Sequence, residues 1–185
     1  MRYCSVLCCL VLLPVGACGV GSAPTHAPLD KGAIERIIVY ADGERVAIQP
    51  GGELWTAVAD HLLTTVSTFS LPAECVLNER AIEALKQQES VVELEFAGVE
   101  KVTLGERLAK EDQERTQADD RGFRVVESDK LLFVLSGEHR GQLLVPLMGE
   151  PPTWGCWAVV TKNELDTRWV EATESLLTSV ESSLP

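Results

Sequence analysis

The segment Ile34–Ile48 reads IERIIVYADGERVAI, with an apolar run on either side of Asp42-Gly43. The dipeptide Asp-Gly tolerates the positive φ angles that a two-residue hairpin turn requires. We therefore predict a β-hairpin with strands Ile34–Ala41 and Glu44–Ile48. Because the strands of a hairpin are antiparallel, this segment favours an antiparallel sheet as the basis of the fold.

The residues after this hairpin change to a helical spacing. Pro50-Gly51-Gly52 interrupts the strand pattern, and the following residues predict an amphipathic helix over Glu53–Phe69. Its apolar face holds Leu54, Trp55, Val58, Leu62, Val66 and Phe69. Pro72 and Cys75 then indicate a turn, and Asn78 is a suitable N-cap for a short second helix that ends at Gln88.

Strict alternation returns at Val91–Phe96, where Glu93 and Glu95 share one side and apolar residues share the other. This predicts a strand with one solvent-exposed face. Turns are expected at Ser128-Asp129, Gly137–Gly141 and Gly149–Gly155, and they separate further strands at Phe123–Glu127, Lys130–Ser136, Gln142–Leu147 and Cys156–Thr161. Such short connections join antiparallel neighbours.

A C-terminal amphipathic helix completes the pattern. Asn163 is a suitable N-cap for it, and its apolar face holds Leu165, Trp169, Ala172, Leu176 and Val180. The fold class predicted is α+β, an antiparallel sheet of about five to seven strands with two or three helices packed against one face. Residues 32–185 have the length of a single domain with its own core.

The N-terminus has the three parts of a secretory signal peptide. Arg2 supplies positive charge, Val6–Val15 is almost wholly apolar, and the small residues Gly16-Ala17 follow. The apolar run is shorter than the roughly 18 to 20 residues of a membrane-spanning helix, and Pro14 interrupts it. We expect residues 1–17 to be a signal peptide that is removed during export.

Val15-Gly16-Ala17-Cys18 directly follows the apolar run and resembles the lipobox of bacterial lipoproteins, with valine where leucine is commoner. In that family a dedicated peptidase cuts before a cysteine whose thiol carries a diacylglyceryl group. The resemblance covers only the leader and implies lipidation of Cys18 and anchoring at the cell membrane or the outer envelope surface. Val15 and Ala17 also satisfy an ordinary signal peptidase, so free secretion is the alternative.

The stretch after the lipobox predicts a tether. Gly19–Lys31 consists mainly of small, polar and proline residues, and we expect residues 18–31 to be flexible. Without Arg2 the mature chain has 15 basic and 28 acidic residues, a net charge of −13. An acidic surface repels phosphate backbones and anionic headgroups, so we expect no nucleic-acid partner and membrane contact only through the lipid.

Cys75 and Cys156 are the two cysteines of the predicted domain. In an exported chain they are a candidate disulfide. Closing a loop of about 80 residues would stabilise the fold by up to about 4 kcal/mol in the chain-entropy model. Two separate buried thiols are the alternative.

Trp154 and Trp157 lie just after Pro151-Pro152. A proline-bounded aromatic loop can offer flat contact area to a protein or a glycan, which makes both residues candidate partner contacts. The simpler interpretation is that both indoles cover the core beside Cys156.

Two clusters could support hydrolysis. Ser136 and His139 occur together at a strand end, and the α-carbons of Glu93 and Glu95 would lie about 7 Å apart, a spacing that resembles the paired carboxylates of inverting glycosidases. However, Ser-Gly-Glu-His is typical of a polar hairpin turn, and outward glutamates are typical of surface. We therefore assign no catalytic residue.

No metal or cofactor is predicted. The charged segment Gly105–Gly122 is expected to be a solvated helix or a mobile excursion. Its candidate Ca²⁺ ligands lack the spacing of an EF-hand loop: Asp112, Glu114, Asp119 and Asp120. No pair among His26, His61 and His139 has metal-ligand spacing, and His61 fits a half-buried helix position.

Together these features favour an exported envelope lipoprotein with a non-enzymatic binding or interaction domain. Its expected partners are the membrane, through the lipid, and a protein or another envelope component. The alternative is an extracytoplasmic hydrolase with a site at Ser136/His139 or Glu93/Glu95.

Overall fold

A computed structural model describes residues 29–69, 71–104, 124–147, 149–161 and 164–181. The predictions for the following residues lie outside these ranges: the expected signal peptide, Cys18, His26, the charged segment Gly105–Gly122 and Asn163. The described chain forms a seven-stranded antiparallel sheet in the order β2-β1-β4-β5-β6-β7-β3, with a separate two-stranded ladder β8-β9. The α+β class, the antiparallel sheet and the C-terminal helix are as predicted.

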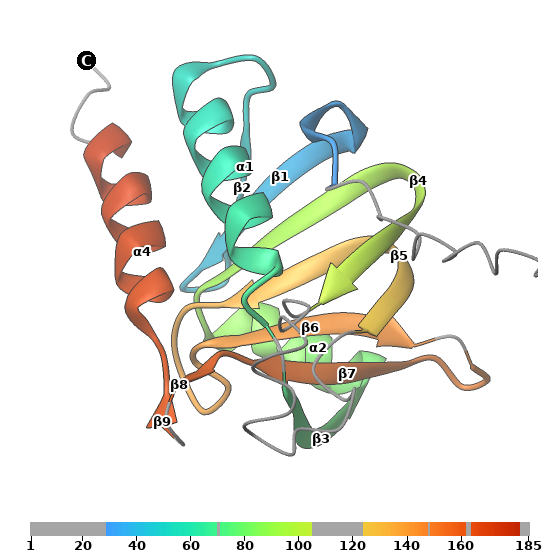
Figure 1. Ribbon diagram of the computed structural model, residues 1–185. Coiled ribbons are helices and arrows are strands. Elements are labelled where there is room, and N and C mark those ends of the chain that lie inside the picture. The colour runs from blue at the N-terminus through green and yellow to red at the C-terminus, as the bar shows by residue number, and fades with distance from the viewer. Residues whose placement is uncertain (1–28, 70, 105–123, 148, 162–163, 182–185) are drawn as a thin grey trace, which may run out of the picture.

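The elements follow one another along the chain, coloured from blue to red in Figure 1. The strands are β1 (Ile34–Ala41), β2 (Glu44–Ile48), β3 (Leu71–Asn78), β4 (Val91–Leu104), β5 (Arg124–Val134), β6 (Gln142–Leu147), β7 (Thr153–Ala158), β8 (Val160–Thr161) and β9 (Glu164–Leu165). The helices are η1 (Lys31–Ala33, a 3-10 turn), α1 (Glu53–Val66), α2 (Glu79–Gln88) and α4 (Arg168–Glu181).

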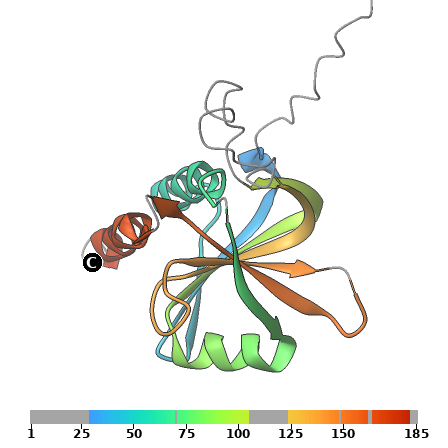
Figure 2. The ribbon, with the colours of Figure 1, turned by 60° about the horizontal axis from the view of Figure 1, so that its bottom comes forward.

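Helices cover both faces of the sheet, not one face as predicted. Figure 2 shows α1 and α4 side by side on one face and α2 alone on the other. Because side chains alternate along a strand, each central strand contributes to two cores. In β5, Phe133 belongs to the larger core beneath α1 and α4, and Leu132 belongs to the smaller core beneath α2.

The predicted hairpin is confirmed residue by residue. Ala41 pairs with Glu44, and Asp42 and Gly43 form the turn with φ angles of 51° and 79°. Both angles are positive, as the two-residue turn requires. β1 then pairs with β4 on its other side, which places the hairpin at one edge of the sheet.

The predicted turn at Pro72 and Cys75 is wrong, because this segment is the edge strand β3. β3 pairs with β7 alone in the seven-stranded sheet, so a proline without an N–H group is tolerated there. The register shifts between Ala73 and Val76, which marks a β-bulge around Cys75.

The predicted turn at Ser128-Asp129 is also wrong, since β5 runs through it. The Ser128 hydroxyl donates to the Lys130 carbonyl and Ser128 is buried, so its polar group is satisfied inside the strand. The partner strand β4 extends to Leu104 and has a register shift between Glu95 and Glu100. The strand predicted at Cys156–Thr161 is shifted toward the N-terminus, because β7 begins at Thr153 and ends at Ala158.

The α2 cap is confirmed, because the Asn78 side chain accepts a 2.9 Å hydrogen bond from the Ala81 amide. α1 ends at Val66, three residues earlier than predicted, and Phe69 still enters the core. On α4 the predicted face is only partly right. The inward residues are Trp169, Val170, Thr173, Leu176 and Leu177, whereas Ala172 is exposed and Leu165 belongs to β9.

The described residues just before Gly32 already contact the domain. Leu29 packs against the larger core, and Lys31 forms a 2.7 Å ion pair with Asp60 of α1. The last three residues of the predicted tether therefore contact the domain. Among the described residues, no helix has both the length and the apolar character needed to span a bilayer.

Candidate functional site

The disulfide between Cys75 and Cys156 links the edge strand β3 to its neighbour β7. The two α-carbons are 5.6 Å apart, and 81 residues separate the cysteines in the sequence. The pairing agrees with the sequence prediction. Cys156 is buried and Cys75, which lies in the bulge of β3, is half-buried.

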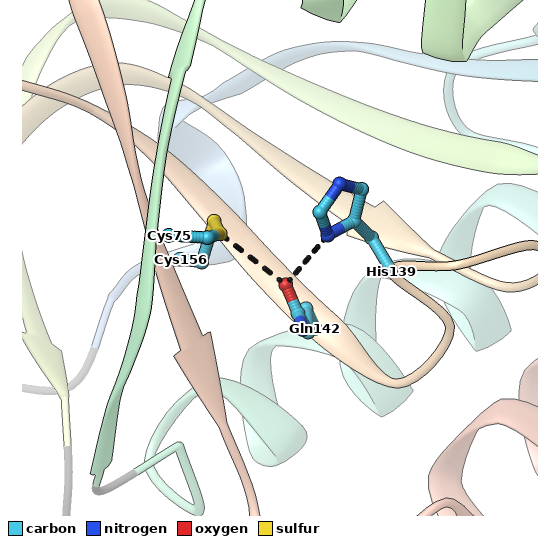
Figure 3. The surroundings of a disulfide bond; sticks show 4 residues. All are labelled: Cys75, His139, Gln142 and Cys156. Atoms are coloured by element: carbon cyan, nitrogen blue, oxygen red, sulfur yellow. Dashed lines mark hydrogen bonds between the residues drawn. A yellow bond between two sulfur atoms is a disulfide. The ribbon is translucent and has the colours of Figure 1, made fainter.

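His139 and Gln142 lie beside this disulfide, as Figure 3 shows. Gln142 is the first residue of β6, and its Oε1 atom is 3.6 Å from Cys75 Sγ and 3.2 Å from His139 Nδ1. The ligand atoms of Cys75, His139 and Cys156 all lie within 4.8 Å of one another. The strands β3 and β7 and the turn that leads into β6 thus place two sulfurs, an imidazole and a carboxamide close together.

The turn that carries His139 depends on its two glycines. Gly137 and Gly141 have φ angles of 75° and 85°. A Cβ at Gly137 would lie 2.1 Å from the Glu89 side chain, and one at Gly141 would lie 2.9 Å from Thr167. The tight packing of this turn fixes the position of His139.

Ser136 and His139 have different partners. The Ser136 hydroxyl oxygen accepts a 2.7 Å hydrogen bond from the Ser90 amide, whereas the His139 ring bonds to Gln142. Ser136, just after β5, is thus hydrogen-bonded to Ser90, the residue before β4. These contacts give Ser136 a structural role rather than that of a nucleophile beside a base.

Glu93 is buried under α2, which corrects the prediction of a solvent-exposed face at this point of β4. It is 2 % exposed. Lys86 of α2 contacts both of its oxygens, at 3.2 and 3.1 Å, and the Tyr40 hydroxyl donates to Oε2 at 2.8 Å. The ammonium of Lys86 also lies 5.0 Å from the centre of the Tyr40 ring. A buried carboxylate is stable there because both neighbours donate to it.

This cluster shifts the ionisation of the phenol. Burial, followed by the hydrogen bond to Glu93 and the charge of that carboxylate, raises the pKa of Tyr40 from 10.0 to about 12. The neighbouring Glu95 is half-buried and pairs instead with Arg36 of β1 at 2.6 Å. Glu93 and Glu95 are therefore each engaged by a separate cation, unlike two carboxylates that share a substrate.

Trp154 and Trp157 are buried, at 1 % and 4 % exposed, so they are not exposed partner contacts. They point to opposite faces of β7: Trp154 belongs to the core beneath α2 and Trp157 to the core beneath α1 and α4. The Trp154 indole N–H donates to Glu79 at 3.0 Å. The simpler interpretation from sequence, burial in the core beside Cys156, holds for Trp154, whereas Trp157 is buried in the opposite core.

His61 is half-buried between two helices, as its sequence position indicated. Its Nε2 atom lies 2.9 Å from the Thr173 hydroxyl and 3.3 Å from the Trp169 carbonyl, both on α4. The role of His61 is thus to join α1 and α4.

Sequence reasoning missed two groupings, the His139–Gln142–disulfide cluster and the Tyr40–Lys86–Glu93 cluster. Each combines residues from separate strands, helices or turns, and no short motif marks either of them. Comparison with models of protein families, with curated proteins and with solved structures gave no match to this chain.

Proposed function

We propose that this chain is an exported envelope lipoprotein that is anchored through Cys18 and presents a non-enzymatic binding domain. The observation that carries the proposal is the covalent pair Cys75–Cys156 inside the domain. Structural disulfides form and persist in oxidising compartments outside the cytosol. This agrees with an expected signal peptide that ends at Ala17, directly before Cys18.

The anchor is tested by comparing Cys18→Ala with Cys9→Ala, a matched loss of a leader cysteine, in the native host. We expect the wild type and Cys9→Ala to partition with membranes and to yield an N-terminal peptide whose Cys18 carries a diacylglyceryl mass. Cys18→Ala should leave the membrane fraction or stay unprocessed. An unmodified Cys18 in the mature wild type would refute the anchor.

Among the described residues, the surface best suited to a partner is the edge of β2 that no other described strand pairs with. β2 and β3 end the seven-stranded sheet, and edge strands are templates for an additional strand. β3 carries Pro72 and a bulge, which both hinder strand addition. β2 keeps a regular register from Glu44 to Ile48, and its Val46 is 58 % exposed. An extended segment of a protein partner is the occupant that fits this edge.

The hydrolase alternative is weaker because two of its candidate residues already bond to other groups of the protein. Glu93 is buried against Lys86 and Tyr40, and Ser136 accepts a backbone N–H. A general base or a nucleophile needs access to substrate. Hydrolysis by the wild type that is lost in both His139→Ala and Ser136→Ala would favour the hydrolase over the binding domain.

The binding edge is tested with a photo-crosslinking residue at Val46 of β2 or at Val76 of β3 in the anchored protein. Val76 is a matched control, since it is a valine of the opposite edge strand and is 67 % exposed. We expect a discrete adduct from position 46 and little from position 76. Equal adducts from both positions would indicate random collision and would contradict strand addition at β2.

A further inference from the structure

We propose that Cys75, Cys156 and His139 form a zinc-binding site once their disulfide is reduced. Their ligand atoms already lie within 4.8 Å of one another. Two thiolates and an imidazole are the donor set that Zn²⁺ takes in proteins, with a fourth position open to an oxygen. This inference rests neither on the lipid anchor nor on the binding edge of β2.

The fourth donor is present beside the three ligands. Gln142 Oε1 is 3.6 Å from Cys75 Sγ and 3.2 Å from His139 Nδ1, so it can complete a tetrahedral set or hold a bound water in that position. Gln142 also orients the imidazole in the absence of metal. Residues that fix a ligand histidine in this way commonly affect metal affinity about 10- to 100-fold.

The site is held by regular structure. Cys156 lies on β7, Cys75 lies on the adjacent β3, and His139 lies in the turn between β5 and β6, which Gly137 and Gly141 allow to close. Cys156 is buried, and Cys75 and His139 are half-buried. An incoming dithiol would therefore approach from the side of Cys75, the less buried of the two cysteines.

The disulfide is converted to the zinc complex in two steps. A small dithiol transfers two electrons and two protons to the Cys75–Cys156 bond, which breaks to two thiols while the reductant becomes a cyclic disulfide. Zn²⁺ then displaces the two thiol protons to solvent and binds both thiolates. Reoxidation of the two sulfurs would release the ion, so the disulfide and the zinc complex are alternative states of the same pair.

The test uses the full chain in detergent with Cys4→Ser, Cys8→Ser, Cys9→Ser and Cys18→Ser, so that only the two domain thiols remain. Zinc binding is measured by competition with a chromogenic chelator, before and after reduction with a phosphine that is then removed. Co²⁺ serves as a spectroscopic probe, because sulfur-to-cobalt charge transfer reports thiolate ligation. We expect one metal ion per reduced chain and none per oxidised chain.

Variants separate ligation from general effects. His139→Ala and Gln142→Ala should each lower zinc affinity at least about tenfold, whereas His61→Ala, which removes the histidine between α1 and α4, should not change it. Circular dichroism of the reduced chain monitors the fold. The proposal is overturned by a reduced chain that binds no Zn²⁺, by one that unfolds on reduction, or by wild-type affinity in His139→Ala.

Discussion

The face of the sheet under α1 and α4 and the face under α2 are built from different contacts. Beneath α1 and α4, Phe69, Phe133 and Trp169 pack edge to face with ring centroids 5.4 to 6.1 Å apart, within a broad apolar core. Beneath α2 the apolar core is smaller and lies beside the Lys86–Glu93 ion pair and the disulfide.

This difference suggests that the α1/α4 face stabilises the fold, whereas the α2 face holds the residues with reactive groups. Apolar burial is nondirectional and tolerates repacking, so the α1/α4 face can supply most of the folding free energy. A buried ion pair contributes little net stability, but it is costly when one partner is lost. The ion pair and the disulfide thus lie on the α2 face, where specific polar contacts fix the positions of the side chains.

The largest effect should come from breaking the α1/α4 core. Phe133→Ala removes a fully buried ring that contacts both Phe69 and Trp169, and we expect a loss of about 3 to 5 kcal/mol in the free energy of unfolding. Its neighbour Leu132 is equally buried but faces α2, so Leu132→Ala should cost less. Urea denaturation of both variants measures the difference.

The exposed Val46→Ala serves as the control and should stay within about 0.5 kcal/mol of the wild type. If Leu132→Ala were as destabilising as Phe133→Ala or more so, the α1/α4 face would not be the main source of stability.

The second effect should come from the ion pair. Glu93→Gln leaves the Lys86 ammonium buried, with Glu83 4.0 Å away as its remaining carboxylate, and we expect a loss of about 3 kcal/mol. Glu95→Gln is the matched control on the same strand. Its partner Arg36 is largely exposed, so the loss should be under about 1 kcal/mol.

The double variant Lys86→Met/Glu93→Leu sharpens this test, because it removes both charges. We expect its stability to lie within about 1 kcal/mol of the wild type, since a buried ion pair and an apolar pair of similar volume are often equivalent. A double variant as unstable as Glu93→Gln would mean that the ion pair itself stabilises the α2 face.

The amino-acid pattern predicted local features well and long-range ones poorly. Asp42-Gly43 and Asn78 act through neighbouring backbone groups, and both behave as predicted. The alternation predicts an exposed face for Glu93, which is in fact buried, because alternation reports which residues share a side of a strand and not what covers that side. Glu93 is buried because α2 covers that face of the sheet, where Lys86 of α2 and Tyr40 of β1 contact the carboxylate.

The candidate site at the disulfide likewise depends on contacts between distant parts of the chain. The pairing of Cys75 with Cys156 followed from cysteine count and compartment, without geometry. The approach of His139 to this pair requires the order β5-β6-β7-β3, which no local pattern specifies. Pro72 was misleading in the same way, because a proline indicates a turn unless its strand lies at an edge.

A smaller effect should come from the ionisation of Tyr40. Its pKa is raised to about 12 in the fold against 10.0 for a free phenol. The contribution to stability is therefore complete below about pH 10 and is lost as the pH rises toward about 12. The chain has two tyrosines, Tyr3 and Tyr40. In a protein prepared from Cys18 onward, phenolate absorbance near 295 nm therefore reports Tyr40 alone.

We expect a titration midpoint near pH 12 in the folded mature chain and near pH 10 in urea. Tyr40→Phe should abolish the signal and the associated part of the pH dependence of unfolding. A folded-state midpoint near pH 10 would mean that the phenol does not share Glu93 with Lys86.

The smallest effect should come from the α2 cap. Asn78→Ala removes the acceptor for the Ala81 amide and should cost about 1 kcal/mol, whereas Asn78→Asp keeps an acceptor and should cost less. Because α2 is the only helix on its face among the described elements, its loosening should be local. Hydrogen exchange of Asn78→Ala should quicken in α2 and leave α1 and α4 unchanged. Equal acceleration of exchange in all three helices would show that the two faces unfold as one cooperative unit. The faces would then differ in the reactive groups that they hold and not in their stability.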